Sequence, residues 1–276
     1  MEIEPGIQVL HEKKVDVGGL VLLITGASGG LGRAIIDACM PYARELRLYT
    51  HSKYTSLCLH KELARMNGTA IVSTSWEETL RDLEEHPKNM GYQIPPEVVK
   101  CRLSKYAVGL DVLINNAGVG LFGQLEEFGW RQISDVVGTN LMETIWWSQQ
   151  AYEDMKRRGR GLIINIASTA GLKGFPYHSV YCASKFGVVG FSQALNEEGR
   201  KYGVRVSCVC PAGIETDFWK KARKDVRDAG FMKPADVAHA IADLVRLPST
   251  ITPELVVYRS PFENFAKVRD SDGKNT

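Results

Sequence analysis

A phenol and an ammonium group stand four residues apart in the sequence YCASK, at Tyr181 and Lys185. The surrounding residues have the apolar spacing of a helix, so both side chains are expected on one side of it, one turn apart. A free tyrosine has a pKa of about 10 and is a poor base at neutral pH, but a nearby ammonium favours the phenolate and is expected to lower that pKa. The pair therefore predicts a proton donor and acceptor. Taken alone, the pattern also fits an ordinary surface pair.

Two more polar residues upstream of this pair are candidates for functional side chains. Ser168 ends the apolar run GLIINIAS (161–168), which reads as a buried strand. Enzymes with parallel sheets keep their sites at the carboxyl edge where such strands end. Asn140 lies inside a long helical stretch, where asparagine is a poor helix former, so it fits either a polar residue on the helix surface or a functional side chain.

The sequence TGASGGLG (25–32) directly follows the first apolar run and opens a helix. Gly26 permits a sharp turn, Gly30 lets backbone amides approach a pyrophosphate, and Gly32 lets the helix pack against the strand. The helix N-terminus adds partial positive charge. Glycine is common in turns of every kind, so it is the position between the first strand and the first helix that indicates a dinucleotide.

The end of the second apolar run distinguishes the two nicotinamide dinucleotides. A carboxylate there binds the 2′-hydroxyl of the ribose in NAD(H) and repels the 2′-phosphate of NADP(H). This chain has no acid there, and the residues are Thr50, His51, Ser52 and Lys53. Hydroxyl groups and a lysine, with Arg33 as a further cation, favour NADP(H) over NAD(H), unless Lys53 is only a surface lysine.

Seven short apolar runs alternate with helical stretches along the chain. The runs are LVLLIT (20–25), ELRLYT (45–50), TAIVS (69–73), LDVLINNAG (110–118), GLIINIAS (161–168), VRVSCVCP (204–211) and ELVVY (254–258). They predict one α/β domain over 1–276, a doubly wound (Rossmann) seven-stranded parallel sheet with helices on both faces. We expect an N-terminal extension at 1–17, a long connection at 75–109 and a flexible tail at 265–276. The segment 214–233 is either a substrate lid or a solvated helix face.

Composition excludes several classes of partner. Hydrophobic residues make up 44% of the chain and the net charge is +2, which gives no reason to expect nucleic acid or an anionic membrane as a partner. The six cysteines form no CxxC pair and no cluster with histidine, so neither a metal site nor a disulfide framework is expected. No signal peptide and no membrane span is predicted, which favours a cytoplasmic location.

These motifs together resemble the short-chain dehydrogenase/reductase family, in its compact single-domain branch. The resemblance covers about residues 18–260 and keeps the order of six motifs: TGASGGLG, NNAG (115–118), Asn140, Ser168, YCASK and PAGIET (211–216). It is nearest to reductases of 3-oxoacyl and 3-hydroxy acid type that use NADP.

The resemblance assigns a role to each matched residue. It implies that Tyr181 exchanges a proton with the substrate oxygen, that Ser168 hydrogen-bonds that oxygen, and that Lys185 binds the nicotinamide ribose. It also implies that Asn140 holds a water in a locally disturbed helix, that Asn116 and Ala117 lie along the adenosine, and that Ile214 and Thr216 lie near the carboxamide. The complete predicted cofactor set is Gly26, Ser28, Gly30, Leu31, Gly32, Thr50, His51, Ser52, Lys53, Asn116, Ala117, Gly118, Tyr181, Lys185, Ile214 and Thr216.

The chain departs from the family pattern in three places. The third apolar run has Ser73, Thr74 and Ser75 where an aspartate commonly contacts adenine, Ala212 replaces the usual glycine after a proline, and the connection at 75–109 is longer than usual. These departures put the adenine contact in doubt and suggest a slightly different backbone beside the nicotinamide.

The predicted substrate site is mostly apolar, which favours a hydrophobic carbonyl compound over a free sugar. Its expected residues are Phe122, Ser168, Phe175, Tyr177, Phe218 and Trp219. The leading hypothesis is an NADP(H)-dependent reductase of a ketone or aldehyde, acting reversibly on a small molecule. An NAD-linked dehydrogenase of hydroxy acids or polyols, and a nucleotide sensor without catalysis, stay open as alternatives. The resemblance also implies a homodimer or homotetramer.

Overall fold

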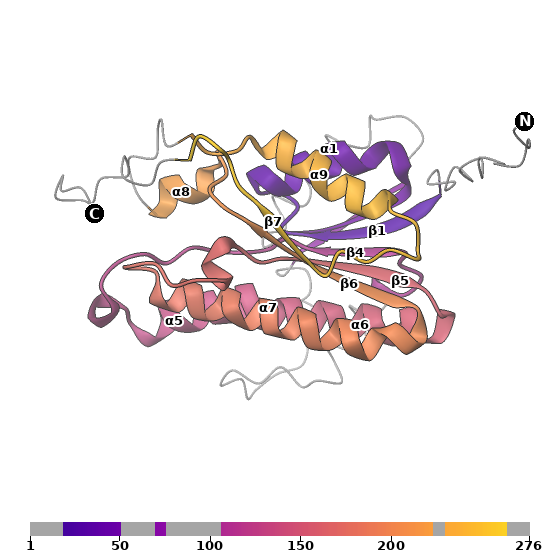
Figure 1. Ribbon diagram of the computed structural model, residues 1–276, viewed down its shortest axis with the longest axis horizontal. Helices are drawn as coiled ribbons and strands as arrows, with labels where there is room; N and C mark the ends of the chain where they lie inside the picture. The colour runs from indigo at the N-terminus through magenta and orange to yellow at the C-terminus, as the bar shows by residue number, and fades with distance from the viewer. Residues whose placement is uncertain (1–18, 51–69, 76–105, 223–229, 264–276) are drawn as a thin grey trace, which may run out of the picture.

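One sheet of seven parallel strands organises the molecule, seen in the computed structural model of Figure 1. The structure describes residues 19–50, 70–75, 106–222 and 230–263. The strands are β1 (Leu20–Thr25), β2 (Ala43–Thr50), β3 (Ala70–Ser75), β4 (Val112–Asn115), β5 (Gly161–Ile166), β6 (Val204–Pro211) and β7 (Leu255–Tyr258). Their order is β3-β2-β1-β4-β5-β6-β7, and every neighbouring pair is parallel. The predicted doubly wound α/β fold is therefore confirmed.

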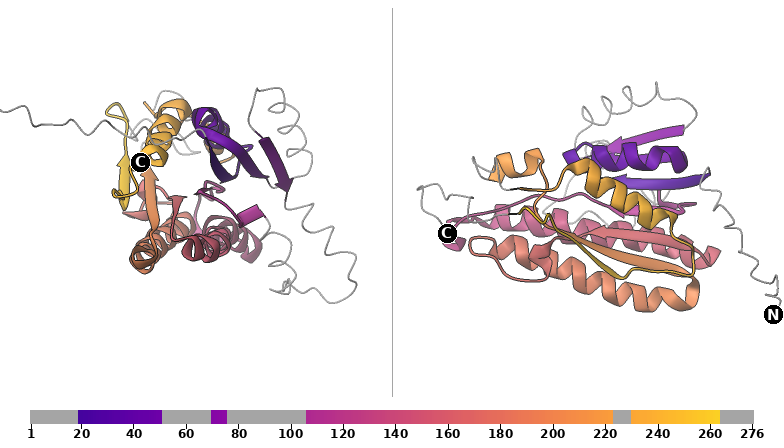
Figure 2. Two further views of the ribbon diagram at one scale, coloured as in Figure 1. Left: turned by 90° about the vertical axis from the view of Figure 1, so that its right-hand side faces the viewer. Right: turned by 45° about the horizontal axis from the view of Figure 1, so that its top comes forward.

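Helices cover both faces of this sheet. On one face lie α1 (Gly30–Cys39) and α9 (Pro234–Arg246), and on the other lie α5 (Trp130–Val137), α6 (Glu143–Arg158) and α7 (Ser179–Gly199). The views of Figure 2 show the same two layers from the side and obliquely. Shorter turns are η1 (Met40–Tyr42), η2 (Leu125–Glu127), η3 (Gly138–Met142), η4 (Thr169–Gly171) and η5 (Arg200–Tyr202), and α8 (Asp217–Ala222) follows the carboxyl end of β6. Because both faces are covered, the central strand β1 is a nearly continuous apolar run, LVLLIT, rather than an alternating one.

Two apolar cores hold the layers together. Between the sheet and α1 with α9, residues such as Leu22, Ile36 and Ile241 are almost completely buried. On the other face, Leu113 of β4 and Trp147 of α6 anchor the packing. Alternate residues of a strand point to opposite faces, so β1, β2, β4, β5 and β6 contribute to both cores.

The chain leaves the centre of the sheet in two directions. From β1 it proceeds to β2 and β3 on one side, and from β4 it proceeds outward to β5, β6 and β7 on the other. The connections after β1 and β4 therefore separate at their carboxyl ends and leave a crevice between them. Open α/β sheets bind their ligands in this crevice.

Some predictions concern residues outside the described ranges. The extension at 1–17, the tail at 265–276, residues 223–229 of the expected lid, and all of the 75–109 connection except Ser75 and 106–109 fall there. Within the described ranges, no helix has the length and apolarity needed to cross a membrane.

Candidate active site

The glycine loop after β1 is shaped by close backbone contacts. Gly26 has a positive φ of 61°, and a Cβ atom there would lie 2.7 Å from the Cα of Ala117. A Cβ on Gly32 would clash with the carbonyl of Gly26, and one on Gly30 would lie 2.9 Å from Thr216. The loop therefore requires glycine at these positions, and α1 begins directly behind it with free backbone N–H groups at its N-terminus.

Hydrogen bonds lock this loop onto the segment after β4. The Thr25 hydroxyl accepts the backbone N–H groups of Asn116 and Ala117, both at 3.0 Å. The Asn116 side-chain amide donates to the carbonyls of Thr25 and Gly26 at 3.1 and 3.2 Å. The two loops that border the crevice therefore form one rigid unit.

A cavity of about 630 Å³ extends from this unit across the carboxyl ends of the central strands. It is lined by 28 residues, which include these members of the predicted cofactor set: Gly26, Ser28, Gly30, Leu31, Gly32, Asn116, Ala117, Gly118, Tyr181, Lys185, Ile214 and Thr216. Ser168, Phe175, Phe218 and Trp219 of the predicted catalytic and substrate sets line it as well. The structure thus brings the glycine loop and the YCASK helix to one cavity.

Tyr181 and Ser168 meet in this cavity. The side-chain hydroxyl groups of the two residues are hydrogen-bonded. The Ser168 hydroxyl also accepts the Ala170 N–H at 3.1 Å, which begins the turn η4 and fixes the serine at the end of β5. Tyr181 is 8% exposed.

The pKa of Tyr181 differs from the expected direction. Burial raises it to about 12, and the hydrogen bond from Ser168 lowers it only in part. We expected Lys185 to lower it, but the Lys185 ammonium donates to the Ile166 carbonyl at 2.9 Å and lies 5.8 Å from the centre of the Tyr181 ring. Loss of hydration outweighs the charge at that separation. Tyr181 is therefore a neutral phenol at physiological pH, the form that donates a proton.

Burial also acts on Lys185, which is 4% exposed. It lowers the pKa of this lysine to about 8, because the charged form loses hydration. Gly118 leaves space beside the ammonium, since a Cβ there would lie 3.6 Å from Lys185 Nζ and 3.4 Å from Asn140 Oδ1. Gly118, in the loop after β4, therefore lies close to both the Lys185 ammonium and the Asn140 side chain.

Asn140 occupies the π turn η3 between α5 and α6 and is completely buried. Its Oδ1 accepts the Val119 N–H at 2.8 Å, and its Nδ2 donates to the Val119 carbonyl and to the Ser184 hydroxyl, both at 3.0 Å. The wider π turn lets an asparagine leave the helix pattern and reach a loop. The disturbed helix expected at this residue is present, while Asn140 lies behind the cavity wall and not in it.

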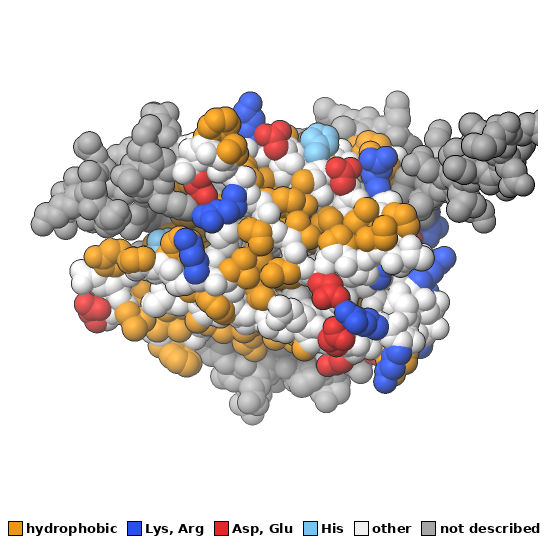
Figure 3. Space-filling view, viewed as in Figure 1, with side chains coloured by type: hydrophobic (Ala, Val, Ile, Leu, Met, Phe, Trp, Pro, Cys, Tyr) orange, Lys and Arg blue, Asp and Glu red, His pale blue; other side chains and the backbone are white. Residues whose placement is uncertain are grey.

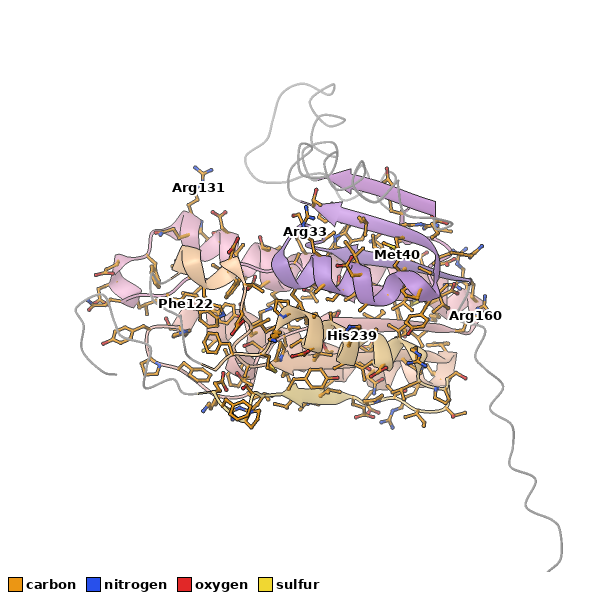
Figure 4. The ribbon with its side chains drawn as sticks, turned by 90° about the horizontal axis from the view of Figure 1, so that it is seen from above. Arg33, Met40, Phe122, Arg131, Arg160 and His239 are labelled. Carbon is orange, nitrogen blue, oxygen red and sulfur yellow. The ribbon has the colours of Figure 1, made fainter. Side chains whose placement is uncertain are left out.

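The structure describes only some of the residues that were expected around the 2′-position of the cofactor ribose. Thr50 is 1% exposed at the end of β2 and does not line the cavity, while His51, Ser52 and Lys53 lie outside the described residues. Arg33 lies on α1 beside the carboxyl end of β2 (Figure 4). The side chains of Ser73, Thr74 and Ser75 are likewise not described.

Aromatic residues form the far wall of the cavity. The Phe122 ring packs edge-on against Tyr181 at 5.5 Å and stacks on Trp219 at 5.6 Å, while Phe218 lies 5.9 Å from Tyr181. Phe122 lies between α7 and α8, where it contacts Tyr181 and Phe218, and does not itself line the cavity. Tyr177 lies apart from it, because a φ of 62° turns the chain there and leaves the side chain 45% exposed.

Some cavity residues were not in the predicted sets. His178, Thr169 and Asp217 line the cavity. The ring centre of His178 lies 4.4 Å from that of Phe122. Each of these residues is adjacent in the sequence to a predicted site residue. This adjacency is the indication from which they could have been predicted.

The fold is a doubly wound parallel sheet with a glycine loop at its switch point, and the site combines a half-buried serine with a buried tyrosine and a buried lysine. These features define the class of protein as an oxidoreductase that uses a dinucleotide. A family model described as short chain dehydrogenase matches residues 20–227. The chain therefore belongs to the short-chain dehydrogenase family.

Curated and solved relatives agree with this family. The chain is 30% identical over 243 residues to sepiapterin reductase of Chlorobaculum tepidum, covering 87% of this chain and 95% of the relative. It is 32% identical over 243 residues to a 3-oxoacyl-acyl-carrier-protein reductase of Rickettsia conorii, covering 83% and 90%.

Two solved structures are also similar. A 3-ketoacyl-acyl-carrier-protein reductase of Brucella melitensis, complexed with NADH, has a TM-score of 0.71 at 25% identity, covering 87% of this chain and 97% of that one. An alcohol dehydrogenase of Thermococcus sibiricus, complexed with 5-hydroxy-NADP, has a TM-score of 0.73 at 24% identity, covering 89% and 98%. At the lower identity the likeness concerns the fold.

Proposed function

We propose that this protein is an NADP(H)-dependent carbonyl reductase that converts a ketone or aldehyde to an alcohol, reversibly. The observation that carries the proposal is the meeting of Ser168, Tyr181 and Lys185 at one cavity that also contains the glycine loop. A protein that only senses nucleotides needs the loop but has no use for a buried phenol beside a serine. Retention of both therefore favours catalysis.

The residues of the cavity fit a dinucleotide. A glycine cradle that a Cβ would fill and the N-terminal amides of α1 suit the pyrophosphate, and Lys185 with Gly118 suits the nicotinamide ribose. When bound, the cofactor supplies or accepts the hydride. The chain's own residues hold the carbonyl oxygen and the proton: Tyr181 donates its phenolic proton to that oxygen, and Ser168 hydrogen-bonds it.

Two further residues support this proton transfer in our proposal. Lys185 carries the positive charge that stabilises the phenolate left on Tyr181 after proton donation. Asn140 fixes the loop at Val119 through two hydrogen bonds, and the same loop passes the Lys185 ammonium at Gly118. Solvent then restores the proton through that side of the site.

The preference for NADP(H) rests on charge. No acidic residue follows β2, where the sequence is Thr50, His51, Ser52, Lys53, and Arg33 lies beside the end of that strand. A 2′-phosphate is stabilised by such cations and would be repelled by a carboxylate. The solved relatives include complexes with both kinds of cofactor, so the preference has to be measured.

Lys53→Glu tests this preference. Reversal of charge at the proposed 2′-phosphate site should weaken NADPH binding by about tenfold or more and leave NADH binding nearly unchanged. Fluorescence titration of the purified wild type and variant with each cofactor provides the measurement. Equal discrimination in both proteins would remove Lys53 from the argument.

The substrate in our proposal is a neutral, mostly apolar carbonyl compound, and residues 214–233 act as its lid. Phe175, Phe218 and Trp219 line the cavity near Tyr181, and the bridge between Ile214 and Met232 closes the base of the lid. An apolar wall with a few polar groups at the reacting end favours such substrates over sugars.

A panel of carbonyl compounds tests the proposed activity. NADPH oxidation is followed with 3-oxo thioesters, 3-oxo acids, steroid ketones, quinones and simple aldehydes, each with NADH in parallel. We expect turnover of neutral apolar ketones with NADPH. Binding of NADPH without turnover of any compound would favour the sensor, and faster oxidation of hydroxy acids or polyols with NAD would favour the alternative dehydrogenase.

We also propose a homodimer or homotetramer in the cytoplasm. Apolar side chains gather over β7 and α9 on the face shown in Figure 3, where Leu255 and Val257 are exposed. Met142 and Phe186 are exposed on the helical face. The described cysteines Cys39, Cys182, Cys208 and Cys210 are free thiols, which suits a reducing compartment. Light scattering after size-exclusion chromatography measures the oligomeric state, and a monomer would contradict it.

A further inference from the structure

A line of buried polar side chains connects the centre of the sheet to the two long helices below it. Asn115 of β4 and Asn165 of β5 are register partners, and Asn115 Nδ2 donates to Asn165 Oδ1 at 2.8 Å. Asn115 Nδ2 also donates to Ser148 Oγ of α6 at 2.9 Å, and Asn165 Nδ2 donates to Ser192 Oγ of α7 at 2.9 Å. These four residues, which we call the polar bridge, are each at most 2% exposed.

Stability alone does not explain the polar bridge. A buried hydrogen bond contributes only about 1 kcal/mol net, and well-packed apolar side chains at the same places would serve as well or better. The bridge even leaves Asn115 Oδ1 without a partner among the described residues, which carries a cost. Hydrogen bonds do supply direction, because they fix where a helix lies along the strands while apolar contacts tolerate sliding.

Of the two helices held in this way, α7 carries Tyr181 and Lys185, and α6 directly follows the π turn that contains Asn140. On α7, Ser192 lies two turns after Lys185 and three turns after Tyr181, and its hydroxyl also donates to the Val188 carbonyl at 2.6 Å. The Cys208 thiol of β6 hydrogen-bonds Ser192 as well. On the strand side, Asn165 immediately precedes Ile166, whose carbonyl accepts the Lys185 ammonium. The hydrogen bond between Asn165 and Ser192 therefore joins β5 and α7, the strand and the helix that together hold Lys185.

On α6 the connection leads to Asn140. Asn115 Nδ2 is 3.4 Å from the Thr144 carbonyl, and the Thr144 hydroxyl donates to the Asn140 carbonyl at 2.9 Å. Ser148 lies one turn further along the same helix. The bridge thus reaches the π turn on one side and the Tyr181 helix on the other.

We propose that Asn165 and Ser192 are positioning residues of the active site, which hold α7 at the place on the sheet where Tyr181 reaches Ser168 and Lys185 reaches the Ile166 carbonyl. This inference rests on the proposed reductase function, because it concerns the alignment of that proton donor. Small displacements of reacting groups are costly, so the loss of one such bond is expected to affect turnover and not only stability.

The test compares two buried serines. Ser192→Ala removes the bond to Asn165, whereas Ser207→Ala removes a hydroxyl on β6 that is equally buried but has no partner among the described residues. We expect Ser192→Ala to lower kcat about tenfold with little change in the KM of the carbonyl substrate or in NADPH affinity. Ser207→Ala should behave like the wild type, and Ser192→Thr, which keeps a hydroxyl, should recover most of kcat.

The pH profile distinguishes positioning from mere stability. In Ser192→Ala the alkaline limb of kcat/KM for NADPH should move to lower pH, because the Ile166 carbonyl that accepts the Lys185 ammonium is no longer aligned with it. A lower melting temperature with unchanged kcat and pH profile would overturn the proposal. If Ser192→Ala does not fold, Ser192→Cys, which weakens the same hydrogen bond with less loss of packing, decides in the same way. The wild type is assayed in parallel, and its failure to turn over any carbonyl would refute the proposed function instead.

Discussion

Tyr181 shows how burial sets the chemistry of a single residue. Its hydroxyl is hydrogen-bonded to Ser168, and its pKa is raised to about 12 because the ring and hydroxyl are withdrawn from water. Lys185, four residues away, is shifted in the opposite direction to about 8 for the same reason. Burial disfavours the charged form of each group, so the phenol keeps its proton while the lysine approaches neutrality. Burial therefore keeps Tyr181 in the protonated form that our proposal requires of the proton donor.

Replacement of the phenol tests the assignment of the proton donor. Tyr181→Phe keeps the ring contacts with Phe122 and Phe218 and removes only the hydroxyl. We expect kcat to fall by about 10²–10⁴-fold, the usual contribution of a general acid. NADPH affinity, measured by fluorescence titration, should stay nearly constant. Substantial reductase activity in the variant would contradict the role of Tyr181.

The lysine predicts a pH dependence. In our proposal the Lys185 ammonium binds the ribose, and its lowered pKa of about 8 means that the charged form is lost as the pH rises through that value. The kcat/KM for NADPH, which reports the free protein, should therefore fall above about pH 8. Lys185→Arg stays charged, so its alkaline limb should vanish even if its activity is lower. An unaltered limb in that variant would assign the titration to another group.

At the scale of elements, the site is built where two loops and one helix meet. The loop after β1 and the loop after β4 are joined through Thr25 and Asn116. The long helix α7 passes close to the turn after β5, where a Cβ on Gly171 would lie 2.7 Å from the Lys185 carbonyl oxygen. Glycine permits these approaches because it has no side chain. Each element is therefore positioned by backbone contacts as much as by side chains.

A pair of glycine substitutions tests whether the loop after β1 requires a residue without a side chain. Gly30→Ala places a Cβ 2.9 Å from Thr216 across the cavity, whereas Gly190→Ala on α7 meets nothing within 4 Å. We expect Gly30→Ala to weaken NADPH binding about tenfold, because the loop has to move away from the ligand. Gly190→Ala should keep the affinity and stabilise the protein by about 0.5–1 kcal/mol. Similar affinities in both variants would show that the loop tolerates a side chain.

At the scale of the whole molecule, the opposite end of the sheet has a structural role. Asp154 of α6 accepts the Gly109 N–H and the Arg158 side chain, both at 2.8 Å, and also pairs with Arg157. Asp111 extends this network, since it accepts the Val21 N–H at 3.0 Å and pairs with Arg158. The network joins the start of β1, the segment before β4 and the end of α6, away from the cavity.

Loss of this network should lower stability without changing catalysis. Asp154→Ala leaves the half-buried Gly109 N–H without its acceptor and removes one of the two carboxylates that pair with Arg158, so the free energy of unfolding should fall by roughly 1–3 kcal/mol. Asp243→Ala is the control, because its pair with Arg246 is exposed and should contribute less than about 0.5 kcal/mol. Urea denaturation measures both, and kcat at 25 °C is expected to equal that of the wild type. A loss of kcat in folded Asp154→Ala would show that this end is coupled to the site.

The sequence by itself determined the strands, the fold class and most of the residues that meet at the cavity. Apolar runs and the glycine loop are local patterns, and the carboxyl ends of parallel strands come together in any sheet of this order. Gly26 and Ser168 could therefore be predicted from where their strands end, and Tyr181 and Lys185 from their spacing on one helix.

Only the tertiary structure decided what depends on contacts between distant segments. The Tyr181 pKa follows from burial, which no spacing along the chain records, and the exposure of Tyr177 follows from a backbone turn at that residue. The pairing of Asn115 with Asn165 requires the register of two strands that are 50 residues apart. Hydration, backbone conformation and register are set when the layers pack, and for that reason they appear only in the folded molecule.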